Sequence, residues 1–450
     1  MHSVLARSLL MTAILPLATA LPAPAADADP VPPAVEPGSI AVDPSAAAAK
    51  ETRFHGYLRA GAGVNGEGGA MERFLDSRVG RLGNESDLYG EVAISHDLAR
   101  TATDRWFVTL RAALSDAQWS DGNSVDINLP EAFVGAEGLL GQGEALWVGR
   151  RFYRRRDVHV MDFYYANLSG NGAGIEHLAT PLGAFSAAVI INGREGQVTV
   201  VDGATPVTVD ASSGDHGRPV LSALCIGLDT AWLDTDLVLG GSRAGTYQDA
   251  GGIDYAYQSV AMGGLALYLH HELPGGRNLL ALQGGLGAAD PFNLDGFPDT
   301  ALTPVIGTST ERTGTAHLVR LVEDIAWRPG DAPWQVAAAA DAEWADDGVG
   351  DDGIGRRIDL VARPSWWFTP NLGIAAEPGA SWIDQPGRPT RLVKATVALQ
   401  ARVTRDLFAR PVLRVFATWA WWEGGEANAS GAYAGDDRGL NIGAQTEVWW

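Results

Sequence analysis

Apolar and polar residues alternate with a period of two along much of the chain. Near its end, Leu440, Ile442 and Val448 share one parity, while Asn441 and Glu447 share the other. The same alternation recurs in residues 54–60, 88–95, 393–403 and 413–419. Because successive side chains of a strand point to opposite faces, these segments are predicted to be β-strands with one apolar and one polar face.

This alternation fits a soluble β-sandwich, with the apolar face in a core, and equally a membrane barrel, with the apolar face against lipid. Two further features favour the barrel. The chain ends in Trp449 and Trp450, and barrels place aromatic residues at the lipid boundary. The single cysteine, Cys225, leaves no disulfide for a sandwich.

The N-terminus resembles an export signal. Arg7 precedes an apolar stretch at residues 9–21, and Ala23-Pro24-Ala25 offers a small-residue cleavage site. The alternative is a membrane anchor, but the stretch is short for a spanning helix and Pro16 interrupts it. We therefore expect a signal peptide at residues 1–25.

Residues 26–50, rich in Ala and Pro, are expected to form an extended periplasmic segment, and residues 51–450 the barrel. Long Gly/Asp/Pro-rich stretches, such as 288–313, alternate with short turns such as Pro274-Gly275-Gly276. At about 22 residues per strand and connection, the predicted fold is an all-β, transmembrane, antiparallel barrel of about 18 strands. Its long loops would be extracellular and its short turns periplasmic.

Composition excludes several classes of function. The net charge of −21 argues against nucleic acid as a partner. A single cysteine rules out a Cys-based zinc site, and we expect neither a metal nor a cofactor. We find no Ser-His-Asp or paired-carboxylate arrangement with distinctive spacing, so an outer-membrane hydrolase is disfavoured and the protein is not expected to be an enzyme.

Several motifs are more specific than the alternation. They are FHGYLR at 54–59, RLGNE at 81–85, YGE at 89–91, GRRFYRRRDVHVMDFYY at 149–165, RVFAT at 414–418 and EVWW at 447–450. Together they resemble the maltoporin family of sugar-specific outer-membrane porins, and the resemblance spans nearly all of residues 52–450.

The resemblance implies a trimer of 18-stranded barrels, each with an aromatic slide facing a track of ionisable groups. The positions matching the slide are Tyr57, Tyr89, Phe408 and Trp449, with Trp119 at the position that reaches a neighbouring subunit's mouth. The positions matching the polar track and the inward-folded constriction loop are Arg59, Arg81, Glu91, Arg155, Asp157, His159, Asp162 and Tyr164.

The chain departs from the family pattern at three places. A mid-channel aromatic of the family falls near Leu279 and Leu280, so that contact would be aliphatic. A family arginine falls at Pro130, and Ser86 occupies one position of the family's small disulfide. These departures bear on the preferred sugar rather than on the fold.

The residue chemistry supports a sugar channel independently of the resemblance. Tyr57 and Trp449 lie on the charged parity of their strands, so their rings should face water. Rings match the apolar faces of a pyranose, while Arg, Asp and Glu match its hydroxyls. The predicted function is facilitated diffusion of maltose and malto-oligosaccharides. The alternatives are a general or anion-preferring pore, in which the arginine-rich run 150–156 sets selectivity, or a porin for another oligosaccharide such as sucrose. Expected partners are these sugars, outer-membrane lipid, two further copies of the chain and a periplasmic sugar-binding protein.

Overall fold

The structure is a computed structural model. It describes residues 49–75, 77–116, 125–193, 197–202, 205–210, 220–243, 245–248, 254–257, 259–288, 290–294, 316–346, 355–384, 389–424 and 431–450. The predicted signal peptide, nearly all of the segment 26–50, and Trp119 lie outside these residues.

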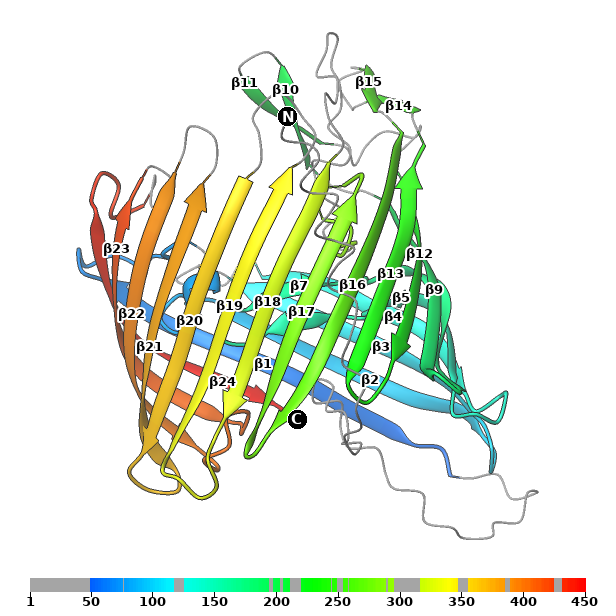
Figure 1. Cartoon of the computed structure of the whole chain (residues 1–450), viewed down its shortest axis with the longest axis horizontal. Helices are drawn as coiled ribbons and strands as arrows, with labels where there is room; N and C mark the ends of the chain where they lie inside the picture. Colours follow the sequence, from blue (N-terminus) through cyan, green and yellow to red (C-terminus); the bar gives the residue numbers. More distant parts are fainter. Residues whose placement is uncertain are drawn as a thin grey trace, which may run out of the picture.

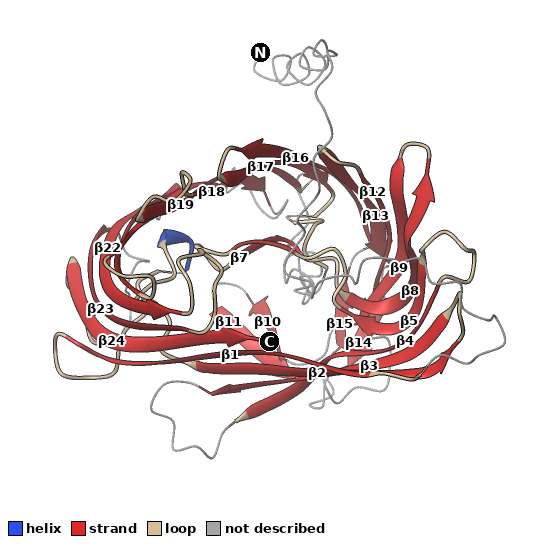
Figure 2. Ribbon diagram, turned by 90° about the horizontal axis from the view of Figure 1, so that it is seen from below, coloured by secondary structure: helices blue, strands red, loops and turns tan. Residues whose placement is uncertain are grey.

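The described residues form one antiparallel sheet of 18 strands that closes on itself, as predicted (Figures 1 and 2). The wall strands are β1 (Thr52–Asn65), β2 (Leu88–Arg100), β3 (Arg105–Asp116), β4 (Asp126–Glu137), β5 (Ala145–Arg151), β8 (Gly170–Thr180), β9 (Gly183–Gly193), β12 (Val220–Asp229), β13 (Leu233–Ser242), β16 (Val260–Leu273), β17 (Gly276–Leu286), β18 (His317–Trp327), β19 (Trp334–Asp346), β20 (Gly355–Trp367), β21 (Leu372–Asp384), β22 (Thr390–Arg402), β23 (Val412–Glu423) and β24 (Arg438–Trp449).

The remaining elements belong to loops. They are η1 (Ser77–Val79), β6 (Arg156–Val158), β7 (Phe163–Ala166), β10 (Gln197–Asp202), β11 (Thr205–Asp210), β14 (Gly245–Gln248) and β15 (Asp254–Tyr257). The loop strands β10, β11, β14 and β15 lie at one end of the wall, and short turns such as that between β16 and β17 lie at the other (Figure 1). We call these ends the long-loop rim and the short-turn rim. In the described residues, no helix is long and apolar enough to cross a membrane.

The barrel closes where β1 pairs with β24 in a seam that joins the two ends of the sheet. Their register places Tyr57 opposite Trp449 and Arg59 opposite Glu447. The backbone of Trp450 extends the ladder with two 3.1 Å hydrogen bonds to Gly56. A Cβ at Gly56 would lie 2.0 Å from Cζ2 of the Trp450 indole, so only glycine fits beneath that ring.

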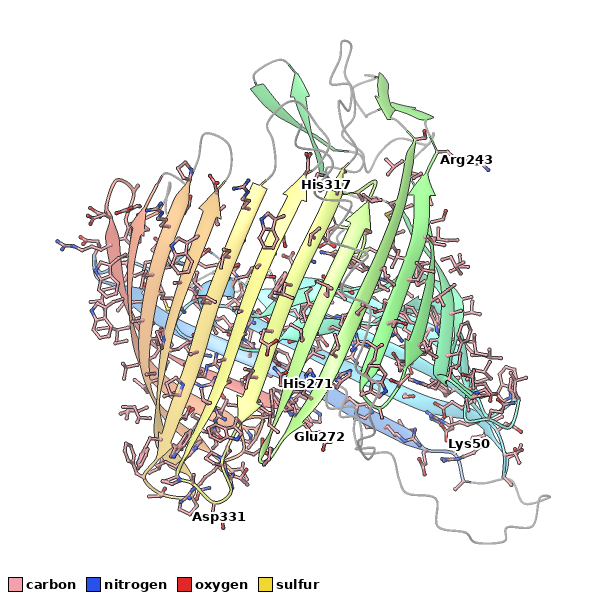
Figure 3. All side chains as sticks on the ribbon, in the orientation of Figure 1. Lys50, Arg243, His271, Glu272, His317 and Asp331 are labelled. Carbon is pink, nitrogen blue, oxygen red and sulfur yellow. The ribbon has the colours of Figure 1, made fainter. Side chains whose placement is uncertain are left out.

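The two faces of the wall differ as the alternation predicts. On β24 the outward Ile442 is 50% exposed, whereas the inward Asn441 and Glu447 are 0% and 2% exposed. In Figure 3, the labelled Arg243 and His317 lie toward the long-loop rim, and Asp331 lies at the short-turn rim. An apolar outer band between polar rims matches the bilayer, in which every backbone polar group must be satisfied within the barrel.

Two connections fold into the barrel rather than outward. The first inner loop, residues 66–87 except the undescribed Asp76, carries η1, and the second inner loop, residues 152–169, carries β6 and β7. Figure 2 shows η1 and β7 inside the ring of wall strands. Buried side chains of the second inner loop, such as Tyr153, Met161 and Tyr165, join buried wall residues in the largest apolar cluster of the described chain. The core of this barrel therefore consists of its own loops packed against the inner wall.

Candidate functional site

The second inner loop is fastened to the wall at its start and near its end. Arg154 lies at φ 42°, and its guanidinium donates to both carboxylate oxygens of Asp229, at 2.6 and 3.0 Å, and to Asp236. Farther on, the backbone oxygen of Tyr165 accepts from Gln283 Nε2 at 2.9 Å. These contacts hold the segment against the inner wall and fix where its side chains project.

The first inner loop is held against the wall at β21 and β22, chiefly by a buried lysine. Lys394 Nζ, on β22, donates to the backbone oxygens of Gly80 and Leu82 at 2.5 and 2.6 Å. Glu377 on β21 accepts from the Leu82 amide at 2.8 Å and from Arg363 Nε at 2.5 Å. Both backbone neighbours of Arg81 are thereby pinned to the wall.

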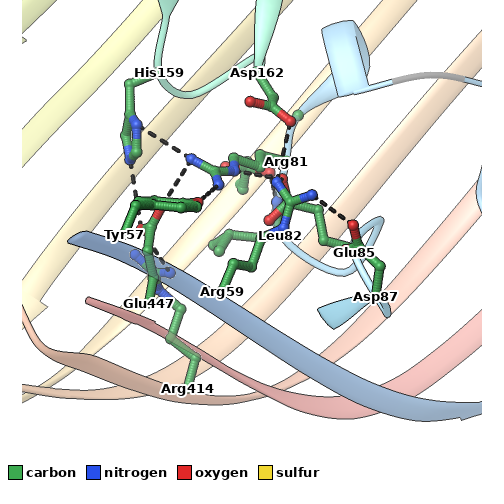
Figure 4. A network of polar contacts seen from close by, with 12 residues as sticks. Tyr57, Arg59, Arg81, Leu82, Glu85, Asp87, His159, Asp162, Arg414 and Glu447 are labelled. Atoms are coloured by element: carbon green, nitrogen blue, oxygen red, sulfur yellow. Dashed lines mark hydrogen bonds and ion pairs between the residues drawn. The ribbon is translucent and has the colours of Figure 1, made fainter. Parts of the chain in front are cut away.

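Arg81 projects from this clamp into a network that joins both inner loops to the seam (Figure 4). Its guanidinium donates to Glu85, lies 2.9 Å from Glu447 Oε1, and donates to the Tyr57 hydroxyl at 2.7 Å. Tyr57 in turn donates to Glu447 Oε1 at 3.0 Å. A predicted slide residue and a predicted track residue are thus directly bonded.

Arg59 extends the network on the other side of Glu85. Its guanidinium lies 2.9 Å from Glu85 Oε1, 2.7 Å from Asp87 Oδ2 and 3.3 Å from Asp162 Oδ2. Because Asp162 belongs to the second inner loop and Glu85 and Asp87 to the first, Arg59 ties both loops to β1. Asp162 adopts φ 47°, which turns the chain at this point.

His159 of the second inner loop lies between two guanidinium groups. Arg81 Nη1 is 3.2 Å from its Nδ1, and Arg410 Nη2 is 2.8 Å from its Nε2. A neutral imidazole accepts at only one nitrogen, and an imidazolium accepts at neither. As a neutral ring, His159 can accept a hydrogen bond from one of the two guanidinium groups, which fixes it to its neighbours inside the barrel.

Burial and these neighbours shift the protonation of the loop groups. Burial raises the pKa of the Glu85 carboxyl to about 7, against the opposing effect of Arg81 and Arg59. Burial holds the pKa of His159 well below its usual value, with Arg81 acting in the same direction and Glu447 against it. Burial opposes ionisation of Asp162, but the two guanidinium groups outweigh it and lower the pKa of this carboxyl.

The four predicted slide residues that the structure describes fall into two groups of rings. Tyr57 and Tyr89 have ring centroids 5.9 Å apart, tilted by 56°. Phe408 and Trp449 each meet the His159 ring edge to face, at 5.7 and 6.0 Å. Because Tyr57 and Trp449 are opposite one another across the seam, the two groups are neighbours on the inner wall.

The remaining predicted residues are Glu91, beside Tyr89, and three residues in or next to the β6–β7 hairpin. Tyr89 donates to Glu91 at 2.5 Å, and the Arg155 guanidinium lies over the Tyr164 ring at 4.3 Å from its centroid. Asp157 is paired with Tyr164 in the β6–β7 hairpin. Tyr164 is 37% exposed, which is more than Arg155 or Asp157.

The departures from the family pattern have clear positions. Leu279 of β17 packs against the interior cluster, and Leu280 has the opposite parity. Pro130 occupies a bulge in β4, where a residue without an amide hydrogen is tolerated. On the adjacent strand, Arg111 donates to Glu131 at 2.6 Å and to Glu91 at 2.8 Å, so a guanidinium does reach this height of the channel.

Sequence reasoning did not select three of the charged residues that complete the site. Arg111 shares the inward parity of β3 with Arg105, Phe107 and Thr109, so the alternation contained the signal for it. Glu447 lies on the polar parity of the last strand, together with Trp449, and in the EVWW motif, but neither signal assigned it to the site. Arg410 lies in a turn, where strand parity gives no information, and its guanidinium lies 3.9 Å from the Trp449 ring centroid.

Comparison with known proteins found a matching family, a relative and similar solved structures. A family model described as LamB porin matches residues 52–450. A maltoporin of Vibrio cholerae is 27% identical over 435 residues, covering 92% of this chain and 98% of that protein. Among solved structures, OccK8 (OprE) of Pseudomonas aeruginosa is 9% identical with a TM-score of 0.47, covering 89% of this chain and 98% of that one. OccAB2 of Acinetobacter baumannii is 10% identical with the same TM-score and coverage.

Proposed function

This chain belongs to the LamB porin family, and from that premise we propose that it is a carbohydrate-specific channel that passes maltose and malto-oligosaccharides by facilitated diffusion. As a member of this family it is an outer-membrane β-barrel porin, and it is a channel rather than an enzyme. The selective function rests on the side chains inside the barrel.

One observation carries the proposal, namely the inward-facing rings of Tyr57 and Trp449 beside the ionised network of Arg59, Arg81 and Glu447. Rings offer apolar surfaces to the C–H faces of a pyranose, and guanidinium and carboxylate groups bind its hydroxyls. Since the charged groups are already bonded to each other, a sugar exchanges one set of hydrogen bonds for another. Such exchange gives weak, similar sites that a ligand can both enter and leave.

Current recordings through single channels in planar bilayers test this function. Maltohexaose should block the open current of the wild-type channel, and Trp449→Ala should weaken the block while ion conductance remains. Trp421→Ala is the matched control, because Trp421 is 48% exposed on the outer face. An open current that is indifferent to millimolar oligosaccharide would refute the sugar function.

A general or anion-preferring pore is the main alternative, with the arginine run at residues 150–156 setting selectivity. The pairing of these side chains weighs against it. Arg154 is bonded to Asp229 and Asp236, and Arg156 lies 3.0 Å from Asp234 Oδ2. Arg154 and Arg156 therefore hold the loop on the wall, and their positive charges are balanced by carboxylates instead of being available to attract anions. Preference for another sugar, such as sucrose, is tested by measuring block with maltose, maltotriose, sucrose and a xylo-oligosaccharide in parallel.

We also propose that the functional unit is a homotrimer, supported by a groove on the outer wall at the seam. The groove has a volume of about 660 Å³ and small residues such as Ala60, Ala62 and Ala444 on its floor. Ala444→Trp should convert the native trimer to monomers on a non-denaturing gel. Leu265→Trp, on the outer face of β16, should not.

The remaining proposals concern export and partners. We propose that residues 1–25 are cleaved, that residues 26–50 extend into the periplasm and that Trp119 reaches the mouth of a neighbouring subunit. The mass of the mature protein tests the first. Cross-linking from Trp119→Cys within the trimer tests the last, and pull-down with a periplasmic sugar-binding protein tests that partner.

A further inference from the structure

Four arginines lie on the inner wall, in strands and a turn near the seam between β24 and β1. Arg363, Arg402 and Arg414 lie on β20, β22 and β23, and Arg410 lies in the turn between the last two strands. All four are buried, with 2%, 4% and 2% exposure for the strand residues and 1% for the Arg410 side chain. We call them the arginine cluster.

Negative charge near the arginine cluster is insufficient to balance it. Arg363 is paired with Glu377 and Arg410 with Glu447, both at 2.5 Å. Each carboxylate is shared with a further cation, Glu377 with Lys394 and Glu447 with Arg81. Arg402 and Arg414 therefore have no carboxylate of their own among the described residues.

Arg414 is the most poorly compensated member. Its Nη1 is 4.0 Å from Glu447 Oε2, and that carboxylate already pairs with Arg410 and Arg81. Within the described chain, its Nε and Nη2 atoms are buried and have no hydrogen-bond partner. A buried guanidinium with free donors and excess positive charge is costly unless an acceptor completes it.

The residues with unpartnered donors are neighbours on the inner face of β22 and β23. Gln400 lies directly opposite Arg414 in the β22–β23 register, and Arg402 Nη2 donates to Gln400 Oε1 at 3.0 Å. Gln400 Nε2 and Arg402 Nε also lack partners in the part of the chain that the structure describes. One acceptor, Gln445 Oε1, is also unpartnered, and Gln445 lies opposite Arg414 in the β23–β24 register. If the Gln445 side chain rotated to accept from Arg414, three of the four unpartnered donors would still lack an acceptor.

We propose that Arg402, Arg414 and Gln400 form a binding site for a small oxyanion of the phosphate or sulfate class. A tetrahedral oxyanion accepts several hydrogen bonds at once and matches the donor fork of a guanidinium. It would also neutralise the excess charge of the arginine cluster. The site adjoins the inner-loop network, because Arg414 Nη1 lies 4.0 Å from Glu447 Oε2 (Figure 4). The inference does not depend on which sugar the channel carries.

Thermal unfolding of the full-length protein in detergent micelles tests the site. The midpoint is compared in phosphate and in chloride at equal ionic strength and pH, with sulfate as a further arm. Phosphate should raise the midpoint of the wild type by about 2–4 °C. Arg414→Gln should abolish the shift. Arg391→Gln should keep it, because Arg391 lies on the same strand as Arg402 with a side chain 70% exposed.

The sign of the effect in chloride gives an independent check. Without an oxyanion, Arg414→Gln removes uncompensated positive charge and should raise the midpoint, whereas in phosphate it should lower it relative to the wild type. If Arg414→Gln does not fold, equilibrium dialysis of the wild type with labelled phosphate decides. Saturable binding of one phosphate per chain supports the site. Binding that does not saturate, no phosphate-specific shift, or an equal shift in Arg414→Gln would overturn it.

Discussion

The buried lysine that clamps the first inner loop allows a quantitative test of how the site is held. Lys394→Met keeps the length of the side chain and removes its charge and three donors. The Gly80 and Leu82 oxygens, which accept from Nζ at 2.5 and 2.6 Å, then lose a charged donor in a buried place. Removing one partner from a buried ionic contact costs about 3–5 kcal/mol, and we expect a fall of this size in the free energy of unfolding.

Thr396→Val provides the matched comparison on the same strand. Thr396 Oγ1 donates to the same Leu82 oxygen at 3.0 Å without carrying a charge. Loss of this neutral hydrogen bond should cost about 1 kcal/mol. Both values are measured by denaturant unfolding in micelles followed by tryptophan fluorescence.

The local consequence is separable from the global one. Freed from Lys394, the backbone around Arg81 should open often enough for trypsin to cut after Arg78 or Arg81 while the barrel remains folded. Sugar block should weaken in the same variant, because Arg81 no longer has a fixed position beside Tyr57. A Lys394→Met protein that is as stable as Thr396→Val and resists trypsin would refute the clamp.

Three further predictions concern the seam, the buried histidine and the missing aromatic. Gly56→Ala should destabilise the barrel by about 1–3 kcal/mol, because its Cβ would overlap the Trp450 indole, and an unchanged midpoint in heat-modifiability gels would contradict this. Because the folded pKa of His159 is depressed, the unfolded chain binds the proton first, and stability from this group is lost as pH falls below about 6.5. His159→Gln should therefore lose less stability than the wild type between pH 7 and 5, and parallel unfolding curves would argue against a neutral His159. Leu279→Phe, at an inward position, should strengthen maltohexaose block by restoring a ring, whereas Leu280→Phe on the opposite face should leave it unchanged.

Strand parity made most of the wall predictable from sequence. Tyr57, Arg59 and Trp449 face inward because they share a parity with charged neighbours, and that rule needs only a few consecutive residues. The same rule would have revealed Arg111. It gives no information in turns, which is why Arg410 was not selected.

The partners of the inward side chains were not predictable in this way. Lys394 was visible as a polar residue on a strand, but its acceptors lie more than 300 positions earlier in the chain. Pro130 indicated that a guanidinium donor is missing from β4. The neighbouring strand β3 supplies one, Arg111, next to the bulge in the β3–β4 register. Such contacts depend on how the inner loops dock, which no local pattern encodes.

The pairing of β1 with β24 also constrains how this molecule is made. A hydrogen bond such as that from Tyr57 to Glu447 joins residues 390 positions apart, so both edges of the sheet stay open until the final strand has been synthesised. Open edges recruit other strands, and distant pairing is slow. The nascent protein must therefore be kept apart from other chains until β24 pairs with β1, with Trp450 bonded to Gly56, because this pairing removes the last free edge of the sheet.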